Sequence, residues 1–482
     1  MDGKDTVVVG CPGTGKTTFL AKLIAEYRAQ HPRPVVFCSH TRAAAKAALD
    51  KSIDNDPGVQ VQTIHSFCFR HLNMSKAQVP DWRQLSEFCS SVGAPMGRNE
   101  GEEDIGNDIG DDYLSMVALA TARLCSPAEI YNGSPRRDGG LQHFLSFCTS
   151  YAKWKDTYGF IDFSDMVLRA LKIERFGDMG LLVVDEAQDL TPLQWKVIER
   201  ILVATPGCQV VIAGDSDQAI NSWAGADPLG MHKFEETRGA ERIVLPQSYR
   251  VPGVIHGLAE DIIDRAAHKV NRTYAPRSGS VGSYVRCSDV SDLKPWGRDT
   301  LILYADKFQR REVERELIEC ATGYTAISGS PAPLDNRVGR AIMAAYTDTP
   351  DEGVIKKALN ERGRRTVDSV GMEPILKALR RSDFCHLSMP PHLYDYYYRV
   401  PKIHPAIRIS TIHGAKGLEA DDVHLILGRS TAAAEQDWID PDQSHRLMYV
   451  GATRTKNRLF TYETGQNDYD FPIERHDIRR TA

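Results

Sequence analysis

Short apolar runs alternate with helical stretches along most of this chain. Residues 6–9, 180–184 and 210–213 are largely apolar runs, each long enough for one buried strand. Residues 19–24 follow the first run with helical spacing, and residues 300–321 read as a strand followed by an amphipathic helix. Strands that alternate with helices in this way predict the α/β class, with doubly wound parallel sheets.

Polar residues and one aromatic residue follow the run at 210–213. The run ends in Gly214-Asp215, Gln218 comes next, and Trp223 stands five residues after Gln218. The simplest structural interpretation is a loop between a strand and a helix, with Trp223 packed into the core of the next helix.

Composition limits the class of protein without naming its function. A chain of 482 residues is too long for one core, and two to four domains are expected. No apolar run of about 18 residues is present, so no transmembrane helix is predicted. The first ten residues lack the features of a signal peptide, which predicts a cytoplasmic protein.

Neither the cysteines nor the net charge indicates a particular site. The 10 cysteines show no metal-binding spacing, which favours reduced thiols. A net charge of −5 neither indicates nor excludes a nucleic-acid partner. A binding groove needs only a local basic lining, because distant charges are screened beyond about 10 Å.

A phosphate-binding pattern follows the first apolar run. Residues 10–17, GCPGTGKT, fit the P-loop motif G-x-x-x-x-G-K-[ST] between a strand and a helix. The glycines allow backbone N–H groups to surround phosphate oxygens, Lys16 reaches the β- and γ-phosphates, and the Thr17 hydroxyl ligates Mg²⁺. The predicted ATP-binding residues here are Gly10, Cys11, Pro12, Gly13, Thr14, Gly15, Lys16, Thr17 and Thr18.

An acidic pair ends the run at 180–184. Asp185 is expected to supply the second protein contact to Mg²⁺, and Glu186 to polarise the attacking water. In isolation this pair would read as an acidic helix start. Together with the P-loop it predicts hydrolysis of a nucleotide.

The set of motifs resembles the UvrD/Rep family of superfamily 1 helicases. DEAQD (185–189), GDSDQ (214–218) and the P-loop carry the resemblance first. The other family motifs occur in the expected order, at 35–49, 61–72, 160–171, 245–252, 407–427 and 445–460. Together they extend from residue 10 to about residue 460.

The resemblance implies roles at the nucleotide. Gln218 would sense the γ-phosphate, Arg250 would reach it, and Arg454 would be the arginine finger of the second motor domain. Tyr249 would stack on the adenine, and Glu419 would hold the ribose. The implied catalytic set is Lys16, Asp185, Glu186, Gln218, Arg250 and Arg454, and the ATP-binding set also includes Tyr249, Gly417 and Glu419.

The resemblance also implies contacts to single-stranded DNA. Backbone contacts are assigned to Thr41, Thr63, His65, Thr411 and His413, and base stacking to Phe163 and Trp223. The alternatives are a core position for Phe163, and helix-cap or core positions for the two histidines. Asn221 and Ala224 stand where the family usually has an aromatic residue and an arginine, so Trp223 is expected to carry more of the binding.

Two RecA-like P-loop NTPase domains are expected, each with a mainly helical inserted subdomain, and with ATP in the cleft between the domains. The expected boundaries are 1–74 with 146–248 for the first motor domain and 75–145 for its insertion. The second motor domain would span 249–334 with 402–482, and its short insertion 335–401.

Three local features modify this picture. Residues 99–112 are acidic and glycine-rich, which favours a solvated loop. The basic clusters at 361–365 and 379–381 would contact duplex phosphates or lie on solvated helix faces. The P-loop begins ten residues into the chain, so the upstream adenine-reading segment is expected to be missing, with weaker selection between ATP and GTP.

The predicted function is a single-stranded-DNA-stimulated, Mg²⁺-dependent ATPase that moves 3′ to 5′ and unwinds duplex DNA. Its partners would be single-stranded DNA and single-strand/duplex junctions, and the polarity comes only from the resemblance. One alternative is a translocase that serves a partner such as a nuclease, or removes bound proteins, without processive unwinding. A P-loop kinase or metabolic NTPase is another, although the downstream motifs argue against it. RNA stays open as the strand, because nothing in the sequence reads the 2′-hydroxyl.

Overall fold

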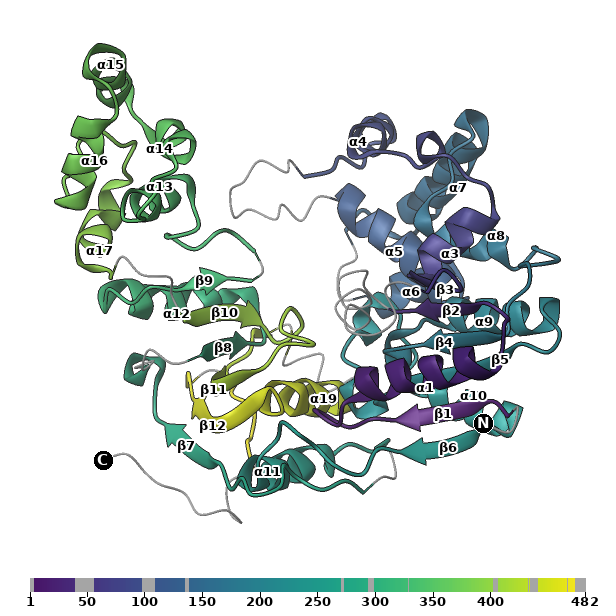
Figure 1. The fold of residues 1–482 in the computed structure, drawn as a ribbon. Coiled ribbons are helices and arrows are strands. Elements are labelled where there is room, and N and C mark those ends of the chain that lie inside the picture. The colour runs from purple at the N-terminus through teal and green to yellow at the C-terminus, as the bar shows by residue number, and fades with distance from the viewer. Residues whose placement is uncertain are drawn as a thin grey trace. The chain divides into compact units, whose positions relative to one another are not determined.

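The chain divides into two compact units in the computed structural model (Figure 1). Unit 1 contains Met1–Tyr249 and Lys269–Ala275, and unit 2 contains Arg250–His268 and Pro276–Ala482. The structure describes residues 4–39, 56–97, 109–134, 138–269, 273–293, 299–327, 329–401, 406–431, 433, 441–465 and 467–472, and every structural statement below concerns these residues.

Unit 1 contains a six-stranded sheet in which every pair of neighbouring strands is parallel. Its order is β3-β2-β4-β5-β1-β6. The strands are β1 (Thr6–Val9), β2 (Val35–Cys38), β3 (Val59–Gln62), β4 (Leu181–Val184), β5 (Gln209–Gly214) and β6 (Glu241–Val244). The three apolar runs of the sequence thus become β1, β4 and β5, and all their residues are buried. Strands buried on both faces read as continuous apolar runs because no face meets water.

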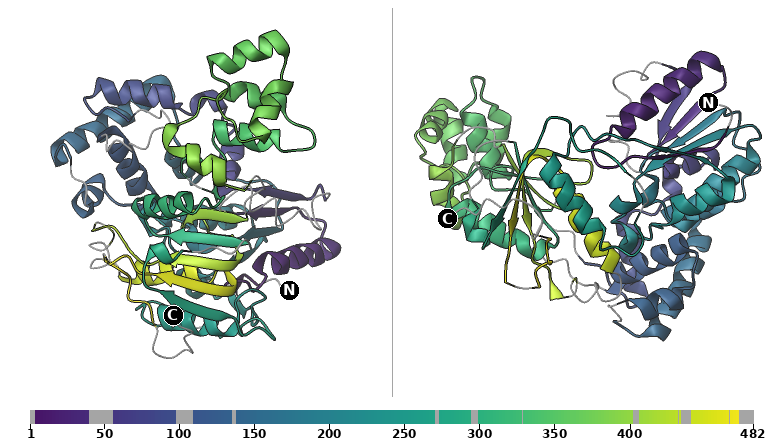
Figure 2. Two further views of the ribbon diagram at one scale, coloured as in Figure 1. Left: turned by 90° about the vertical axis from the view of Figure 1, so that its left-hand side faces the viewer. Right: turned by 90° about the horizontal axis from the view of Figure 1, so that it is seen from below.

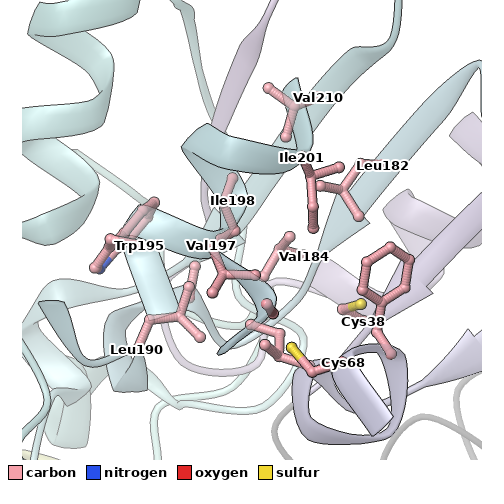
Figure 3. Packing of buried hydrophobic residues seen from close by; sticks show 14 of the residues in the cluster. Cys38, Cys68, Leu182, Val184, Leu190, Trp195, Val197, Ile198, Ile201 and Val210 are labelled. Atoms are coloured by element: carbon pink, nitrogen blue, oxygen red, sulfur yellow. The ribbon is translucent and has the colours of Figure 1, made fainter. Parts of the chain in front are cut away.

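Helices cover both faces of this sheet, as the strand-helix alternation predicts. Leu20, Leu23 and Ile24 of α1 (Lys16–Gln30) pack on one face, against Phe37 and Val183. On the other face, α9 (Pro192–Ala204) packs against β4 and β5 in a larger apolar cluster (Figure 3).

The remaining helices of unit 1 include a group with a core of its own. Aromatic rings fill that core, among them Phe88, Tyr113, Phe144 and Tyr151. This group consists of α4 (Trp82–Ser91), α5 (Ile109–Arg123), α6 (Pro127–Gly133) and α7 (Leu141–Tyr158). The other helices, α3 (Ile64–His71), α8 (Phe163–Ala170) and α10 (Gly230–Arg238), contribute to the core beside the sheet. Short 3-10 turns are η1 (Lys76–Gln78), η2 (Ala187–Asp189), η3 (Ser216–Gln218) and η4 (Ser222–Ala224).

The acidic run at 99–112 is described only at its end. Asp111 and Asp112 lie in the first turn of α5, where negative charge favours a helix start. Residues 109–112 belong to α5, so the predicted solvated loop is wrong there. Residues 99–108 lie outside the described residues, and for them the loop stays a prediction.

Unit 2 contains a second parallel six-stranded sheet, in the order β7-β12-β11-β8-β10-β9. Its strands are β7 (Ser283–Cys287), β8 (Thr300–Tyr304), β9 (Thr325–Ala326), β10 (Ile407–Thr411), β11 (Ala420–Ile426) and β12 (Thr455–Tyr462). The views in Figure 2 show helices on both faces of this sheet. The expected strand and amphipathic helix at 300–321 become β8 and α12 (Lys307–Glu319).

A separate group of helices in unit 2 packs around Ile342, Ile355, Ile375 and Tyr397. The helices of the unit are α11 (Gly253–Ile263), α12, α13 (Arg337–Ala345), α14 (Glu352–Ala358), α15 (Glu361–Val370), α16 (Glu373–Arg380), α17 (Tyr394–Arg399) and α19 (Pro441–Ala452), with 3-10 turns η5 (Val290–Asp292) and η6 (Pro391–Leu393). The two basic clusters of the sequence lie on α15 and at the end of α16.

Two parallel α/β sheets, each with a helical group beside it, confirm the predicted fold class. The exact limits of the inserted segments stay predictions. No helix in the described ranges combines the length and apolarity that crossing a membrane requires.

Candidate nucleotide and nucleic-acid sites

The loop between β1 and α1 has the backbone that the P-loop motif predicts. Gly13 and Gly15 have φ of 73° and 77°, in the left-handed region that favours glycine. Gly10 is required for space, because an added Cβ would lie 1.9 Å from Cγ of Lys16. Thr14 closes the loop by donating its hydroxyl to the carbonyl of Cys11 at 2.8 Å.

The other residues of the loop differ in exposure. Cys11 and Pro12 are buried, Thr17 is half-buried and Thr18 is exposed. Thr17 therefore combines a hydroxyl with access to the site, as a predicted Mg²⁺ ligand requires, whereas the Thr18 side chain faces solvent.

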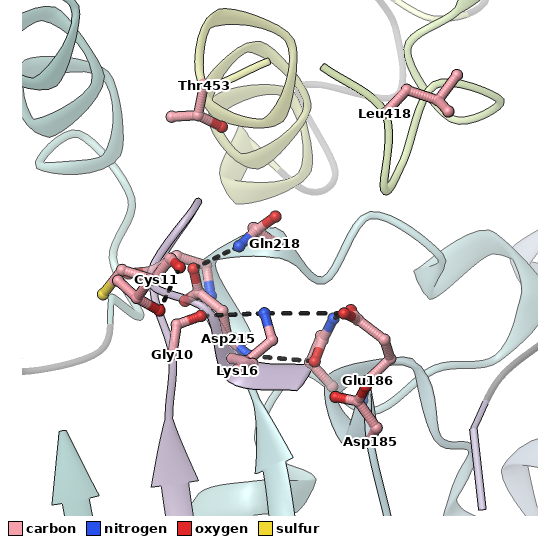
Figure 4. Close-up of polar contacts among 12 residues, drawn as sticks. Gly10, Cys11, Lys16, Asp185, Glu186, Asp215, Gln218, Leu418 and Thr453 are labelled. Carbon is pink, nitrogen blue, oxygen red and sulfur yellow. Dashed lines mark hydrogen bonds and ion pairs between the residues drawn. The ribbon is translucent and has the colours of Figure 1, made fainter. Parts of the chain in front are cut away.

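Lys16 lies among carboxylates at the start of α1 (Figure 4). Its Nζ donates to the carbonyl of Gly10 at 3.0 Å and lies 3.7 Å from a carboxylate oxygen of Glu186. Burial opposes the charge of the ammonium, but Glu186, Asp185 and Asp215 outweigh burial and raise the pKa of Lys16. The site therefore keeps a full positive charge where phosphate oxygens would bind.

Asp185 and Glu186 stand at the end of β4. Burial and the adjacent Glu186 carboxylate raise the pKa of Asp185 to about 7, although Lys16 partly opposes this. A divalent cation would offset the repulsion between two such carboxylates, so the residues present fit Mg²⁺, with Thr17 and Asp185 as its protein ligands.

The backbone of Glu186 is strained. Its φ of 55° is in the left-handed region, which is costly for a residue with a Cβ. The N–H of Glu186 donates to Oδ1 of Asp185 at 2.9 Å, which helps to hold this conformation. Such strain typically persists at functional sites, where the surroundings over-determine the backbone.

Gln218 and Trp223 follow β5 on two short 3-10 turns. Gln218 is buried and donates from Nε2 to Oδ2 of Asp215 at 2.8 Å (Figure 4). Trp223, on η4, is 66% exposed, so the alternative of a core tryptophan is wrong. An arginine of α5, Arg123, donates to the carbonyl of Ser222 at 2.7 Å and ties the η4 turn to that helix.

Tyr249 stands over the P-loop. Its N–H donates to the carbonyl of Gly13 at 2.8 Å, and its ring carbons lie about 4 Å from the position that a Cβ on Gly15 would take. The buried hydroxyl of Ser248 donates to the carbonyl of Pro12 at 2.8 Å. With its side chain 72% exposed, Tyr249 has an open aromatic face beside the phosphate loop, as stacking on a base requires.

In unit 2, Glu419 lies between two cations. Nε of Arg250 lies 2.6 Å and Nζ of Lys456 2.9 Å from its two carboxylate oxygens. Burial opposes the charge of Glu419, but Lys456 and Arg250 together lower its pKa. Gly417, with φ of 85°, forms the turn just before this residue.

Arg454, the predicted arginine finger, is 2% exposed. Its Nε donates to the carbonyl of Val450 at 3.0 Å, and its Nη1 lies 3.5 Å from the carbonyl of Leu418. Its guanidinium is therefore engaged by the backbone of its own unit.

Two of the predicted DNA contacts form an aromatic pair in unit 1. Phe163, at the start of α8, is 61% exposed, so the core alternative is wrong, and its ring meets His65 edge-on at 6.1 Å. Thr63 caps α3 by accepting from the N–H of Ser66.

The other predicted DNA contacts lie elsewhere. In unit 2, the Thr411 hydroxyl accepts from the N–H of Gly414 at 3.0 Å, and His413 is half-buried in the same turn. Thr41 lies outside the described residues, so its predicted contact stays a prediction.

Sequence reasoning missed four residues that support these sites: Arg123, Gln188, Ser248 and Lys456. Gln188, Ser248 and Lys456 stand inside quoted motifs, so the motif itself was the available signal. Arg123 carries no pattern that separates it from other surface cations, because its partner is a backbone carbonyl.

Comparisons with known proteins agree with these features. A model of the UvrD/REP helicase N-terminal domain matches residues 2–238, and a model of the UvrD-like helicase C-terminal domain matches residues 393–464. ATP-dependent DNA helicase UvrD2 of Mycobacterium tuberculosis is 26% identical, over 94% of this chain and 75% of the relative. DNA helicase II of Haemophilus influenzae is 29% identical over 50% of this chain and 37% of its own length. PcrA of Bacillus subtilis, also an ATP-dependent DNA helicase, is 23% identical over 78% of this chain and 55% of its own length.

Both halves of the family are therefore represented, in the expected order and on two parallel α/β sheets. The chain belongs to the UvrD/Rep helicase family.

Proposed function

We propose that this chain is an ATP-dependent DNA helicase that single-stranded DNA stimulates and that moves 3′ to 5′ along the strand. One observation carries the hydrolytic part: Lys16, Asp185 and Glu186 converge at the P-loop of unit 1. The relatives named as ATP-dependent DNA helicases support DNA as the substrate.

The residues of unit 1 divide the chemistry between them. Lys16 binds the β- and γ-phosphates, and Glu186 orients the attacking water as general base. Mg²⁺, when bound, neutralises charge on the phosphates. Gln218 contacts the γ-phosphate, and Tyr249 stacks on the adenine without selecting one purine strongly.

Exposed aromatic rings support the binding of a single strand. Phe163 and Trp223 present open faces on unit 1, and base stacking on such faces tolerates any sequence. Replacement of Trp223 by alanine should weaken single-strand binding by about 1–3 kcal/mol and uncouple ATP hydrolysis from unwinding. Unchanged DNA affinity in this variant would remove Trp223 from the binding surface.

The first test is the rate of ATP hydrolysis with and without an oligodeoxynucleotide. Hydrolysis should depend on Mg²⁺ and rise with the oligonucleotide. Lys16→Ala should abolish it and Glu186→Gln should leave only a slow residual rate, while single-strand binding persists. Wild-type turnover by Lys16→Ala would refute the assignment, and no response to DNA would favour a metabolic NTPase.

Polarity and unwinding need tailed duplexes. A 3′-tailed duplex should be separated and a 5′-tailed duplex left intact. Equal separation of both would refute the 3′-to-5′ direction. DNA-stimulated hydrolysis without strand separation would instead favour a translocase that serves a partner.

A further inference from the structure

A buried amide touches both the proposed general base and the strand that leads to Gln218. Gln188, on η2, is 0% exposed. Its Nε2 donates to Oε2 of Glu186 at 2.5 Å, and its Oε1 accepts from the N–H of Asp215 at 3.1 Å. One side chain therefore joins the end of β4 to the end of β5.

Chemistry determines which way this amide faces. The backbone N–H of Asp215 only donates, so the oxygen of Gln188 must face it. The NH₂ group is then left for Glu186, whose carboxylate can only accept. The bond to Asp215 is buried and the bond to Glu186 is partly buried, so losing either would cost more than losing a bond at the open surface.

The end of β5 leaves room for this amide. An added Cβ on Gly214 would lie 2.3 Å from Oε1 of Gln188 and 2.7 Å from the sulfur of Met231. The φ of Gly214 is not in the left-handed region, so space rather than backbone conformation requires glycine here. A methyl group at this position would push against Gln188.

Two groups hold Glu186 from opposite oxygens. Lys16 lies 3.7 Å from Oε1, whereas Gln188 bonds Oε2. Without the amide, the carboxylate would lose its partner at Oε2, and the attraction of Lys16 would draw it toward the ammonium. A base paired closely with Lys16 is poorly placed to accept a proton from water.

We propose that Gln188 is a positioning residue, which keeps the carboxylate of Glu186 directed at water and links it through Asp215 to Gln218. Gln218 donates to Oδ2 of Asp215, the N–H of Asp215 donates to Gln188, and Gln188 donates to Glu186, so a shift of Gln218 reaches Glu186 through three hydrogen bonds. This inference rests on the proposed function, because it assigns Glu186 the role of base.

Gln188→Leu tests the inference, since it keeps the approximate volume and removes both hydrogen bonds. The kcat for ATP should fall about 10- to 100-fold. The KM and the affinity for a non-hydrolysable ATP analogue should change less than about threefold. Gln188→Glu should be as slow, because it keeps an acceptor for Asp215 but has no donor for Glu186.

A control separates positioning from general loosening. Gln194 closes the capping box of α9 by accepting from the N–H of Thr191 at 2.9 Å. Gln194→Leu removes a glutamine hydrogen bond nearby without touching Glu186, so it should lower the thermal midpoint and leave kcat within about twofold. Equal losses of kcat in the two variants would overturn the inference.

A double-mutant cycle gives the sharpest result. In the Glu186→Gln background, single-turnover hydrolysis should be the same with and without Gln188→Leu, because the amide acts only through Glu186. If the loss in rate of the double variant equals the product of the losses in the two single variants, the inference is overturned. If Gln188→Leu does not fold, Gly214→Ala tests the same inference with Gln188 retained. Its methyl group would displace Gln188, so kcat should fall in this variant as well.

These outcomes are distinct from failure of the proposed function. If the wild-type chain does not hydrolyse ATP, or Glu186→Gln retains full activity, the proposed function fails. If wild-type hydrolyses ATP, Glu186→Gln is severely slowed, and Gln188→Leu is unimpaired, only the role of Gln188 fails.

Discussion

The nucleotide residues of unit 1 and those of unit 2 are held in different ways. In unit 1, Lys16 and Glu186 contact each other and neighbouring groups of the same loop cluster. In unit 2, Arg250 is paired with Glu419, and Arg454 donates to backbone carbonyls. The residues of unit 1 surround the position where phosphates would bind, whereas the arginines of unit 2 have partners within their own unit.

This difference follows from the cost of burying charge. A buried guanidinium needs hydrogen-bond partners in every state of the protein, so Arg454 can leave its carbonyls only for a group that binds at least as well. A transferred phosphate is such a group. We therefore expect the residues of unit 1 to provide most of the binding of ATP, and Arg454 of unit 2 to affect mainly turnover.

Arg454→Ala should have the largest effect on turnover, and it tests the contrast between the residues of the two units. If Arg454 stabilises the transferred phosphate, kcat should fall about 10³-fold or more, with little change in the affinity for an ATP analogue. Pre-steady-state hydrolysis and equilibrium binding measure the two quantities. A loss of binding as large as the loss of kcat would place Arg454 in the ground-state site instead.

Acid should affect the two sheets in opposite directions. Burial lowers the pKa of His424, in β11, from 6.5 to about 4. The charge of Asp422 opposes this shift, and the charge of Arg458 adds to it. Its contribution to stability is complete above pH 6.5 and is lost as the pH falls through about 4. Asp185 has a raised pKa, so without Mg²⁺ its contribution is present below pH 3.8 and is lost as the pH rises through about 7.

Amide exchange at pH 6.5 and pH 4, corrected for intrinsic rates, measures this contrast. The opening free energy of β11 should fall by about 3 kcal/mol at pH 4, the equivalent of the His424 shift. The opening free energy of β4 should be the same or higher at pH 4 than at pH 6.5. His424→Leu should remove the fall in β11, and a parallel fall in both strands would contradict the expectation.

Gly10→Ala should show how far the unit 1 site depends on the position of Lys16. The added methyl group collides with the Lys16 side chain, so kcat/KM for ATP should fall about 100-fold. Gly133→Ala is the matched control, since a Cβ there meets nothing within 4 Å. Retention of full activity by Gly10→Ala would mean that Lys16 can bind phosphate from another position.

Arg123→Ala should weaken single-strand binding about fivefold, the equivalent of one hydrogen bond. Without the bond to Ser222, the η4 turn that carries Trp223 is less well positioned. Fluorescence anisotropy of a labelled oligonucleotide measures the loss, with Arg83→Ala, an exposed cation of α4, as the control. Equal losses in both variants would indicate a general charge effect.

Lys456→Met should give the smallest effect, a rise in KM for ATP of about threefold. Lys456 supports Glu419, but a partly exposed ion pair contributes little. Lys377→Met, which removes an exposed pair with Glu373, provides the control. An unchanged KM would mean that Arg250 alone holds Glu419.

Strands and phosphate residues were predictable because each carries a local pattern. The runs that became β1, β4 and β5 are continuous and apolar, and the P-loop spacing specifies a loop conformation that few sequences share. Trp223 and Phe163 were ambiguous in sequence, since an aromatic residue beside a helix start is equally suited to a core or to a surface. Only exposure in the folded chain separates the two.

The role of Gln188 could not be read from its motif. Its partners are two residues before it and 27 residues after it, and its burial depends on the space that Gly214 leaves. The internal pairing of Arg250 with Glu419 is equally non-local, because the pairing joins residues 169 positions apart. Such contacts depend on the completed fold rather than on spacing.

The left-handed backbone of Glu186 also bears on how this chain responds to selection. Glycine or asparagine at position 186 would relieve about 1–2 kcal/mol of backbone strain. A library propagated only for heat resistance should therefore accumulate those residues at 186 and lose hydrolysis. Selection for ATP hydrolysis should restore glutamate. At position 186, therefore, a substitution that raises thermal stability lowers turnover, and the reverse.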